Sequence, residues 1–500
     1  MYLMGLDVGT TGAKAVVFDE KGIQQGYGFC EYGITYTKEG FAQQEPEAIW
    51  EIAKEVMKNA AKGNGSQIAA ISLSVQGDAV LPIDENRKAI GPAQLGMDYR
   101  GTEETRWCNE EIGGEKLFSI TGIRPHPMNS VIKILWIKNK QPELYNRTWK
   151  FVTWSDYILA KLGSDEIVID YTQASRTMAF DLKKKEWSKE ILDIMGIGVE
   201  KLAKPAPSGV QVGKIDRRLA QELGINPSAV LVTGGHDQTC ASLGSGVINE
   251  SLALDSHGTA EVISTLMEKP ELTEGMYRDY YPCYCSLLPE RYFTFSLNHT
   301  AGLLLKWFSE NFCKGDYPEA EKNHESIYNY IFAHMPEEPS HVMVLPYMNG
   351  TGTPICDLSQ KGAFLGLTMN TSRFDVAKAI IEALSFESRL NIECLKKNGI
   401  EIKELRCVGG GARSPKGLQN KADILGMPIS SLMVREAACL GAALSAGLSI
   451  KLYQSPEEAV KVVSVKDTYE PDEQKHRIYS DRFKLYKEMY TLFSKVNKRL

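Results

Sequence analysis

The sequence predicts an α/β protein of two domains. Strand-like and helical stretches alternate through the first half of the chain, which is typical of a mixed or parallel sheet covered by helices. Residues 4–22, MGLDVGTTGAKAVVFDEKG, predict a strand, a tight turn and a second strand, and residues 251–265, SLALDSHGTAEVIST, repeat this pattern. The chain has 500 residues, too many for one comfortable core. We therefore expect two related domains over residues 1–247 and 248–500, although two unrelated hairpins would also produce so short a repeat.

The composition argues against several classes of protein. The formal net charge of −6 offers no basic surface for a nucleic-acid backbone. No apolar run approaches the length of a membrane span, and the first strand begins too close to Met1 for a leader peptide. The 10 cysteines are scattered without a C-x-x-C pair, which favours free buried thiols in a reducing compartment. These features predict a cytoplasmic protein with no nucleic-acid or membrane partner.

Two further helices are predicted from their periodicity. Residues 45–62, EPEAIWEIAKEVMKNAAK, form an amphipathic pattern with Pro46 in the first turn. Residues 474–496 space five aromatic side chains by three or four positions. Such spacing places the aromatic rings on one helical face, which we expect to dock on the body of the protein.

The turn of the first hairpin has the residues that a phosphate-binding loop needs. Gly9 and Gly12 allow the backbone to approach a ligand, two threonines lie between them, and Lys14 adds a positive charge. The segment is not a Walker loop, because no helix follows a Gly-Lys-Ser/Thr. An ordinary hairpin with an exposed lysine would explain the same residues.

Two later glycine clusters also follow strands. Residues 230–246, VLVTGGHDQTCASLGSG, place Asp237 at the carboxyl end of a buried strand, where open α/β sheets bind ligands. Asp237 would equally suit the N-cap of the next helix. Residues 405–415, LRCVGGGARSP, place a glycine turn before another helix, an arrangement that favours an anion or a flat ring.

With these motifs the chain resembles the FGGY carbohydrate kinases, the sugar and polyol kinases of the actin-like ATPase superfamily. The resemblance covers nearly the whole chain. Its most specific element is GAFLGLTMNTSRFDVAKAIIE, residues 362–382, which fits the second family signature. The other matches are the first phosphate loop (7–19), the second phosphate loop (257–262), the adenosine loop (409–429) and the helix that closes the nucleotide pocket (436–447).

The resemblance implies two actin-like (ribonuclease H-like) domains with a catalytic cleft between them, and ATP and Mg²⁺ as cofactors. Asp237 matches the family's catalytic base, which takes the proton of a substrate hydroxyl during in-line phosphoryl transfer. Asp7 and Asp237 are the implied metal-binding residues. The implied nucleotide-binding residues are Thr10, Thr11, Gly12, Lys14, Gly258, Thr259, Gly410, Gly411 and Ala412. Because family members are often dimers, the resemblance also suggests a homodimer.

The resemblance implies that the substrate is a small sugar or polyol. The substrate loop SVQGDAV, residues 74–80, has neither the Gln-Met-His-Gly of xylulose kinases nor the Gln-Arg-Glu-Thr of glycerol kinases. The implied substrate-binding residues are Gln76, Gly77, Asp78, Asp98, Arg100 and Gln238. Such a pocket suits a neutral polyhydroxy compound, because each buried hydroxyl needs a partner. A ketopentose of the xylulose or ribulose type is the expected substrate.

Other substrates and other classes of protein remain open. A tetritol or ketotetrose, glycerol or an aldonate are the alternatives, and Arg100 and Arg124 leave room for a sugar acid. A chaperone-like or filament-forming actin-like ATPase would predict an added peptide-binding domain or polymerising inserts. A non-catalytic sugar sensor would share the fold, but the intact Asp7, Lys14 and Asp237 argue against it.

Overall fold

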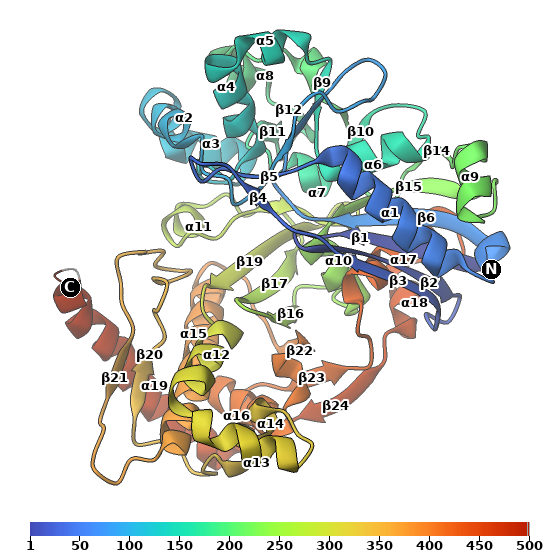
Figure 1. Cartoon of the computed structure of the whole chain (residues 1–500). Helices are drawn as coiled ribbons and strands as arrows, with labels where there is room; N and C mark the ends of the chain where they lie inside the picture. Colours follow the sequence, from blue (N-terminus) through green and yellow to red (C-terminus); the bar gives the residue numbers. More distant parts are fainter. Residues whose placement is uncertain (498, 500) are drawn as a thin grey trace.

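Two mixed sheets, one in each half of the molecule, organise the computed structural model, which describes residues 1–497 and residue 499 (Figure 1). In order across the first sheet, the strands are β14 (Gln211–Lys214), β15 (Val230–His236), β6 (Ile68–Val75), β1 (Tyr2–Val8), β2 (Gly12–Asp19) and β3 (Gln24–Glu31). Across the second sheet they are β18 (Tyr284–Cys285), β19 (Tyr292–Asn298), β17 (Glu261–Met267), β16 (Leu252–His257), β22 (Glu404–Gly409), β23 (Ile429–Leu432) and β24 (Val465–Tyr469).

The helices cover these sheets and form the outer parts of both halves (Figure 1). In the first half they are α1 (Pro46–Ala61), α2 (Thr102–Trp107), α3 (Gly114–Thr121), α4 (Ser130–Lys140), α5 (Pro142–Arg147), α6 (Trp154–Leu162), α7 (Tyr171–Ala174), α8 (Lys189–Met195), α9 (Arg217–Leu223) and α10 (Asp237–Gly244). The second half of the chain contributes α11 (Glu274–Arg278), α12 (Gly302–Phe312), α13 (Tyr317–Lys322), α14 (Ile327–His334), α15 (Arg373–Lys397), α16 (Pro415–Leu425), α17 (Ala437–Ser449), α18 (Pro456–Ala459) and α19 (Glu473–Asn497).

Smaller sheets and ribbons complete the chain. They are β4 (Thr35–Tyr36) with β5 (Ala42–Gln44) and β8 (Ala93–Gln94), β7 (Leu81–Ile83) with β9 (Lys150–Val152), β10 (Val168–Asp170) with β13 (Lys204–Ala206), β11 (Phe180–Asp181) with β12 (Glu186–Trp187), and β20 (Met343–Leu345) with β21 (Ala363–Leu365). They lie outside the two main sheets, which position the site.

The two predicted hairpins occupy equivalent places in the two sheets. β1 pairs antiparallel with β2 and parallel with β6, and β6 pairs parallel with β15. In the second sheet, β16 has the same relation to β17 and β22, and β22 pairs parallel with β23. This agreement confirms the repeat that the sequence predicts. The boundary between residues 247 and 248 remains a prediction.

One helix from late in the sequence packs on the first sheet. α17 contacts β1, β6 and α10 (Figure 1). A Cβ added to Gly441 would overlap with the carbonyl of Cys240, and one added to Gly244 would overlap with the carbonyl of Ala437. These glycines therefore allow α10 and α17 to approach backbone to backbone.

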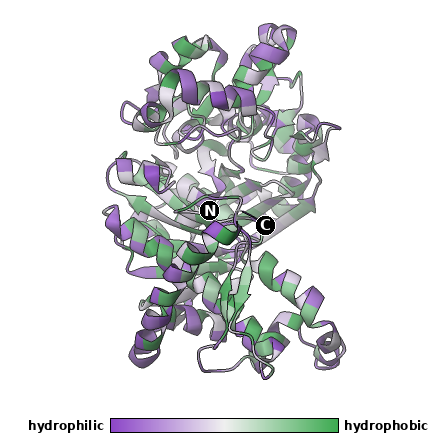
Figure 2. Cartoon of the chain, turned by 90° about the vertical axis from the view of Figure 1, so that its left-hand side faces the viewer, coloured by the Kyte–Doolittle hydropathy of each residue, from purple (hydrophilic) through white to green (hydrophobic). Residues whose placement is uncertain are grey.

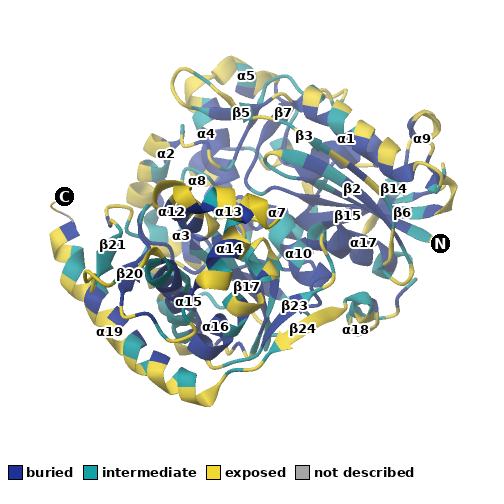
Figure 3. Ribbon diagram, turned by 60° about the horizontal axis from the view of Figure 1, so that its bottom comes forward, coloured by how far each residue is buried: buried dark blue, intermediate teal, exposed yellow. Residues whose placement is uncertain are grey.

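Packing confirms the two helices predicted from periodicity. α1 begins with Pro46 at its first position and buries the face that includes Ile49, Ala53 and Met57. α19 buries Tyr479, Phe483 and Tyr486, while its other face is exposed (Figure 3). Hydrophilic and hydrophobic residues alternate along the helices of both halves (Figure 2). None of the helices in the described part of the chain is both long and apolar enough to cross a bilayer.

A strand-like segment of the second half packs against the first half. The backbone N–H of Cys283 donates to the carbonyl of Gly122 at 2.8 Å, and that of Cys285 donates to Ser175 Oγ at 3.1 Å. All ten cysteines are free, seven of them buried and three partly exposed. The sulfurs of this segment therefore pack in the interior, as the sequence predicts.

Candidate active site

Two carboxylates lie where parallel strands of the first sheet end. Asp7 is opposite Ser74 in the β1–β6 ladder, and His236, the residue before Asp237, is opposite Val75 in the β6–β15 ladder. Ser74 Oγ donates to Asp7 Oδ1 at 2.6 Å. Because parallel strands end at a common edge, sheet topology brings Asp7 and Asp237 together.

The environment raises the pKa of both carboxyl groups. Desolvation raises the pKa of Asp7 to about 6, against a smaller opposing effect of the Ser74 hydrogen bond. Desolvation, followed by the negative charge of Asp7, raises the pKa of Asp237 to about 7. The side chain of Asp237 nevertheless keeps 35% of its surface exposed, so a substrate can reach it.

Asp237 does not act as the N-cap of α10. His236 holds the N-cap position, without a side-chain cap bond, and Asp237 is the first helical residue. Asp237 Oδ1 accepts a hydrogen bond from the N–H of Gln238 at 2.6 Å and lies 3.1 Å from His236 Nε2. Burial, reinforced by the positive charge of Arg176, keeps the pKa of His236 well below its usual range. The imidazole beside Asp237 is therefore neutral.

A buried ion pair that the sequence analysis missed adjoins Asp237. Arg176 Nε donates to Asp78 Oδ2 at 3.2 Å, and its Nη2 donates to the same oxygen. Asp78 has a φ of 65°, in the left-handed region. A Cβ on Gly77 would overlap with Arg176 Nε and crowd His236, so glycine is required between them. The pair joins residues 98 positions apart, and no local pattern marks Arg176.

Three other predicted sugar-binding residues, Gln76, Asp98 and Arg100, bond to the protein itself. Gln76 Nε2 donates to the carbonyl of Gly9 at 3.1 Å, and Thr10 Oγ1 donates to Gln76 Oε1 at 3.3 Å. Gln76 therefore supports the turn of the first hairpin. Arg100 forms a two-armed ion pair with Asp98, at 2.9 and 2.6 Å. These contacts leave both charges of the pair satisfied within the protein.

Two more basic residues donate to backbone carbonyls. The ammonium of Lys133 donates to the carbonyls of Asp78 and Met128, and burial lowers its pKa to about 8. Arg124 Nη1 donates to the carbonyl of Tyr277 at 2.7 Å. Its guanidinium stacks on the rings of Tyr277 and Tyr280 and keeps its charge. Arg100, which is paired with Asp98, is therefore not a free cation for a sugar acid.

A cavity of about 590 Å³ in the second half brings together four of the five residues expected there to bind nucleotide. Gly258 and Thr259 come from the β16–β17 turn, and Gly410 and Gly411 from the turn after β22. The fifth residue, Ala412, is absent from the lining and packs against the hydrophobic core. The volume suits a small organic ligand.

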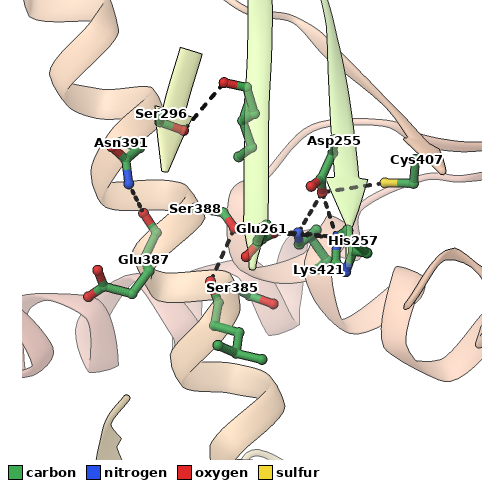
Figure 4. A network of polar contacts seen from close by, with 12 residues as sticks. Asp255, His257, Glu261, Ser296, Ser385, Glu387, Ser388, Asn391, Cys407 and Lys421 are labelled. Atoms are coloured by element: carbon green, nitrogen blue, oxygen red, sulfur yellow. Dashed lines mark hydrogen bonds and ion pairs between the residues drawn. The ribbon is translucent and has the colours of Figure 1, made fainter. Parts of the chain in front are cut away.

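A buried ionic cluster lies beneath these two turns (Figure 4). The ammonium of Lys421, on α16, lies 2.6 Å from Asp255 Oδ2 and 2.7 Å from His257 Nε2, and it also contacts Glu261 Oε1. The carbonyl of His257 accepts a hydrogen bond from Gly410 N–H at 3.0 Å. The cluster therefore joins both turns that line the cavity. Sequence reasoning did not find it.

The structure offers two groups of possible cation ligands. Asp255, His257 and Cys407 place ligand atoms within 4.8 Å of one another, but the Lys421 ammonium already bonds to Asp255 and His257. Asp7 and Asp237 are carboxylates, and the negative charge of Asp7 helps to raise the pKa of Asp237. Mg²⁺ prefers such oxygen ligands. Their donor chemistry therefore fits the predicted metal site.

The other residues of the first hairpin that are predicted to bind nucleotide are at least partly exposed. Thr11 is exposed, and Gly12 begins β2 after accepting a hydrogen bond from Gly9 N–H at 3.0 Å. Lys14 is half-buried and forms an ion pair with Glu436.

Known proteins match this chain over most or all of its length. Residues 2–244 match the N-terminal domain, and residues 254–450 the C-terminal domain, of the FGGY family of carbohydrate kinases. The chain is 27% identical over 506 residues to a xylulose kinase of Lactococcus lactis subsp. lactis (strain IL1403), covering 100% of this chain and 98% of that protein. It is also 27% identical over 453 residues to a gluconokinase of Bacillus subtilis (strain 168), covering 89% and 86%.

A solved structure extends this agreement to the fold. The ligand-bound xylulose kinase from Lactobacillus acidophilus superposes with a TM-score of 0.89 at 25% identity, covering 99% of this chain and 98% of that one. The two domain matches together account for most of the sequence. The chain therefore belongs to the FGGY family of carbohydrate kinases.

Proposed function

We propose that this carbohydrate kinase transfers the γ-phosphoryl group of ATP to a hydroxyl of a ketopentose of the xylulose or ribulose type. The observation that carries the proposal is the position of Asp237, a partly exposed carboxylate with a pKa of about 7 at the edge of the first sheet. A general base works best when its pKa lies near the working pH. Relatives named xylulose kinase favour the ketopentose.

Asp237 is the proposed base. The acceptor hydroxyl donates its proton to the carboxylate as its oxygen attacks the γ-phosphorus. The new O–P bond forms while the bridging P–O bond breaks, and ADP leaves with that electron pair. His236 is neutral, so it lies beside Asp237 without adding a positive charge that would lower the pKa of the base.

Asp7 and Asp237 would hold Mg²⁺, which offsets negative charge on the phosphates when bound. Desolvation raises the pKa of both carboxyl groups, and a bound cation would offset the negative charge of Asp7 and Asp237. Thr10, Thr11, Gly12 and Lys14 are the proposed phosphate contacts from the first half.

The proposed nucleotide site is the cavity lined by Gly258, Thr259, Gly410 and Gly411. Closure of the two halves would bring the γ-phosphate to the acceptor and exclude water, the competing acceptor. Gly77, Asp78 and Gln238 are the proposed sugar contacts, whereas Gln76, Asp98 and Arg100 support the site through one another and the first hairpin. The cytoplasmic location and the homodimer remain predictions.

The test is an ADP-release assay with Mg-ATP across pentuloses, hexuloses, tetritols, glycerol and aldonates. We expect one pentulose to exceed the other compounds clearly in kcat/KM. A clear preference for a tetritol or an aldonate would contradict the substrate. Slow ATP hydrolysis that no sugar stimulates would contradict the kinase reaction and favour a sensor.

A further inference from the structure

A buried guanidinium nitrogen beside the proposed base has no protein partner. The Arg176 side chain is 5% exposed. Its Nε and Nη2 bond to Asp78, but Nη1 has no hydrogen-bond partner among the described residues. The guanidinium carbon lies 4.8 Å from the ring centre of Tyr284, which covers one face. A buried donor without an acceptor is costly, so this nitrogen is a candidate for ligand binding.

Three observations place Arg176 beside the reacting group. The Arg176 charge acts on both His236 and Asp237. A Cβ on Gly77 would meet Arg176 Nε and His236 Nε2 together, so both nitrogens border the same glycine. His236 Nε2 in turn lies 3.1 Å from Asp237 Oδ1. Arg176 therefore adjoins the position where the acceptor substrate must bind.

The polar atoms left free around Asp237 are complementary. Arg176 Nη1 is a donor and cannot accept, whereas the Gln238 side-chain oxygen is an acceptor that also has no partner among the described residues. A ligand bound to both atoms would bring an acceptor oxygen to Nη1 and a hydroxyl proton to the Gln238 oxygen. A carbonyl only accepts, whereas an alditol hydroxyl at Nη1 would bring a further buried proton that needs its own acceptor. A hydroxylated carbonyl compound has both groups.

The charge balance disfavours an anionic ligand. Asp7, Asp78 and Asp237 carry the negative charges of this region. Of the cations near them, Arg176 pairs with Asp78, Lys14 pairs with Glu436, and Lys133 donates to the carbonyl of Asp78. One guanidinium already neutralised by Asp78 leaves the remaining carboxylates to repel a sugar acid. A neutral carbonyl oxygen accepts a hydrogen bond without adding charge.

We propose that Arg176 Nη1 binds the carbonyl oxygen of an open-chain ketose and so selects ketoses over the corresponding alditols and aldonates. This inference rests on the proposed function. In a 2-ketopentose, closure of the furanose ring consumes the C5 hydroxyl, so phosphorylation at C5 requires the open chain with a free C2 carbonyl. Where C5 is the acceptor, recognition of that carbonyl selects the form that can react.

The experiment compares the wild type with Arg176→Lys and Arg176→Met. It measures kcat/KM for the preferred ketopentose and the competitive inhibition constants of the two pentitols made by reducing its C2 carbonyl. Lysine retains a charge for Asp78 but not the second arm of the guanidinium. We expect Arg176→Lys to lose about 10- to 100-fold in kcat/KM for the ketose, with pentitol inhibition changed by less than about 3-fold. Arg176→Met also leaves Asp78 without its cation, so it should weaken both.

The remaining outcomes overturn the proposal. If ketose turnover and pentitol binding weaken equally in Arg176→Lys, Arg176 only positions Asp78. If the wild type prefers an aldonate and Arg176→Met removes that preference, the ligand group is a carboxylate rather than a carbonyl. Arg389→Met serves as the control, because Arg389 bonds to Ile424 and Ser480 in the second half. Absence of any sugar-dependent turnover in the wild type would contradict the proposed function itself.

Discussion

The ammonium of Lys14 lies 2.9 Å from the carboxylate of Glu436, a residue 422 positions later in the chain. Lys14 follows the turn of the first hairpin, and Glu436 holds the N-cap position of α17. The pair therefore joins a proposed phosphate loop to the helix that packs behind it. Both side chains remain partly exposed, so the pair contributes about 1 kcal/mol or less to folding.

Replacing Lys14 should affect ATP rather than stability. We expect Lys14→Met to raise the KM for ATP by about 10- to 100-fold, because a charged donor to the phosphates is lost. Steady-state kinetics at saturating sugar would measure this change. Lys54→Met is the control, since Lys54 pairs with Glu51 and Glu222 on the outside of the first half. An unchanged KM for ATP would exclude phosphate binding by Lys14.

Asp237→Asn should remove catalysis while preserving the fold. The amide has the same shape but cannot take the proton, so kcat should fall by roughly 10²- to 10⁴-fold. Calorimetric titration should show ATP binding close to that of the wild type. Asp216→Asn is the matched control, because Asp216 caps α9 and its loss affects only stability. Turnover near the wild-type rate in Asp237→Asn would refute the assignment of the base.

The pH profile should report the same carboxylate. Since the pKa of Asp237 is raised to about 7, its basic form is lost as the pH falls through that value. We expect kcat/KM for the sugar to decline below about pH 7, approaching a tenfold loss per pH unit. Asp7→Asn removes the neighbouring negative charge, lowers the pKa of Asp237 and moves the decline to lower pH. A wild-type profile that stays flat down to pH 5 would contradict this prediction.

Lys421 should matter most for stability. Lys421→Met leaves Asp255 and Glu261 buried without their cation, which should lower the free energy of unfolding by about 3–5 kcal/mol. Denaturation in guanidinium chloride would measure it. Adding Glu261→Gln should restore part of the loss by removing one uncompensated charge. Lys416→Met on the same helix is the control, because Lys416 is exposed; an equal loss there would exclude a special role for the cluster.

Gly77→Ala should impair sugar binding alone. Its Cβ would overlap with Arg176 and displace the Asp78–Arg176 pair, so the KM for the sugar should rise at least about 10-fold. The KM for ATP should change little, because the nucleotide cavity lies in the second half. Gly33→Ala has open space for the added methyl group and serves as the control. Equal effects of the two substitutions on the sugar KM would contradict the role of Gly77.

Local patterns in the sequence predicted much of the fold and part of the site. The hairpins around residues 9–12 and 258–260, the amphipathic α1 and the aromatic face of α19 all depend on neighbours within a few residues. Asp237 was predicted for the same reason, because a buried strand followed by glycines places the next side chain at the sheet edge. The lining of the nucleotide cavity by Gly258 and Gly410 agrees with their glycine turns.

The sequence by itself determined the repeated hairpins, the helical faces and the strand ends, because turn chemistry and hydrophobic period act over short distances. Only the tertiary structure decided which charged groups became partners. Asp78 meets Arg176 across 98 positions, Asp255 meets Lys421 across 166, and Lys14 meets Glu436 across 422. Partner choice at such separations follows from how strands align and helices pack, which no local pattern contains. The same packing leaves Arg176 Nη1, near Asp237, without a hydrogen-bond partner among the described residues.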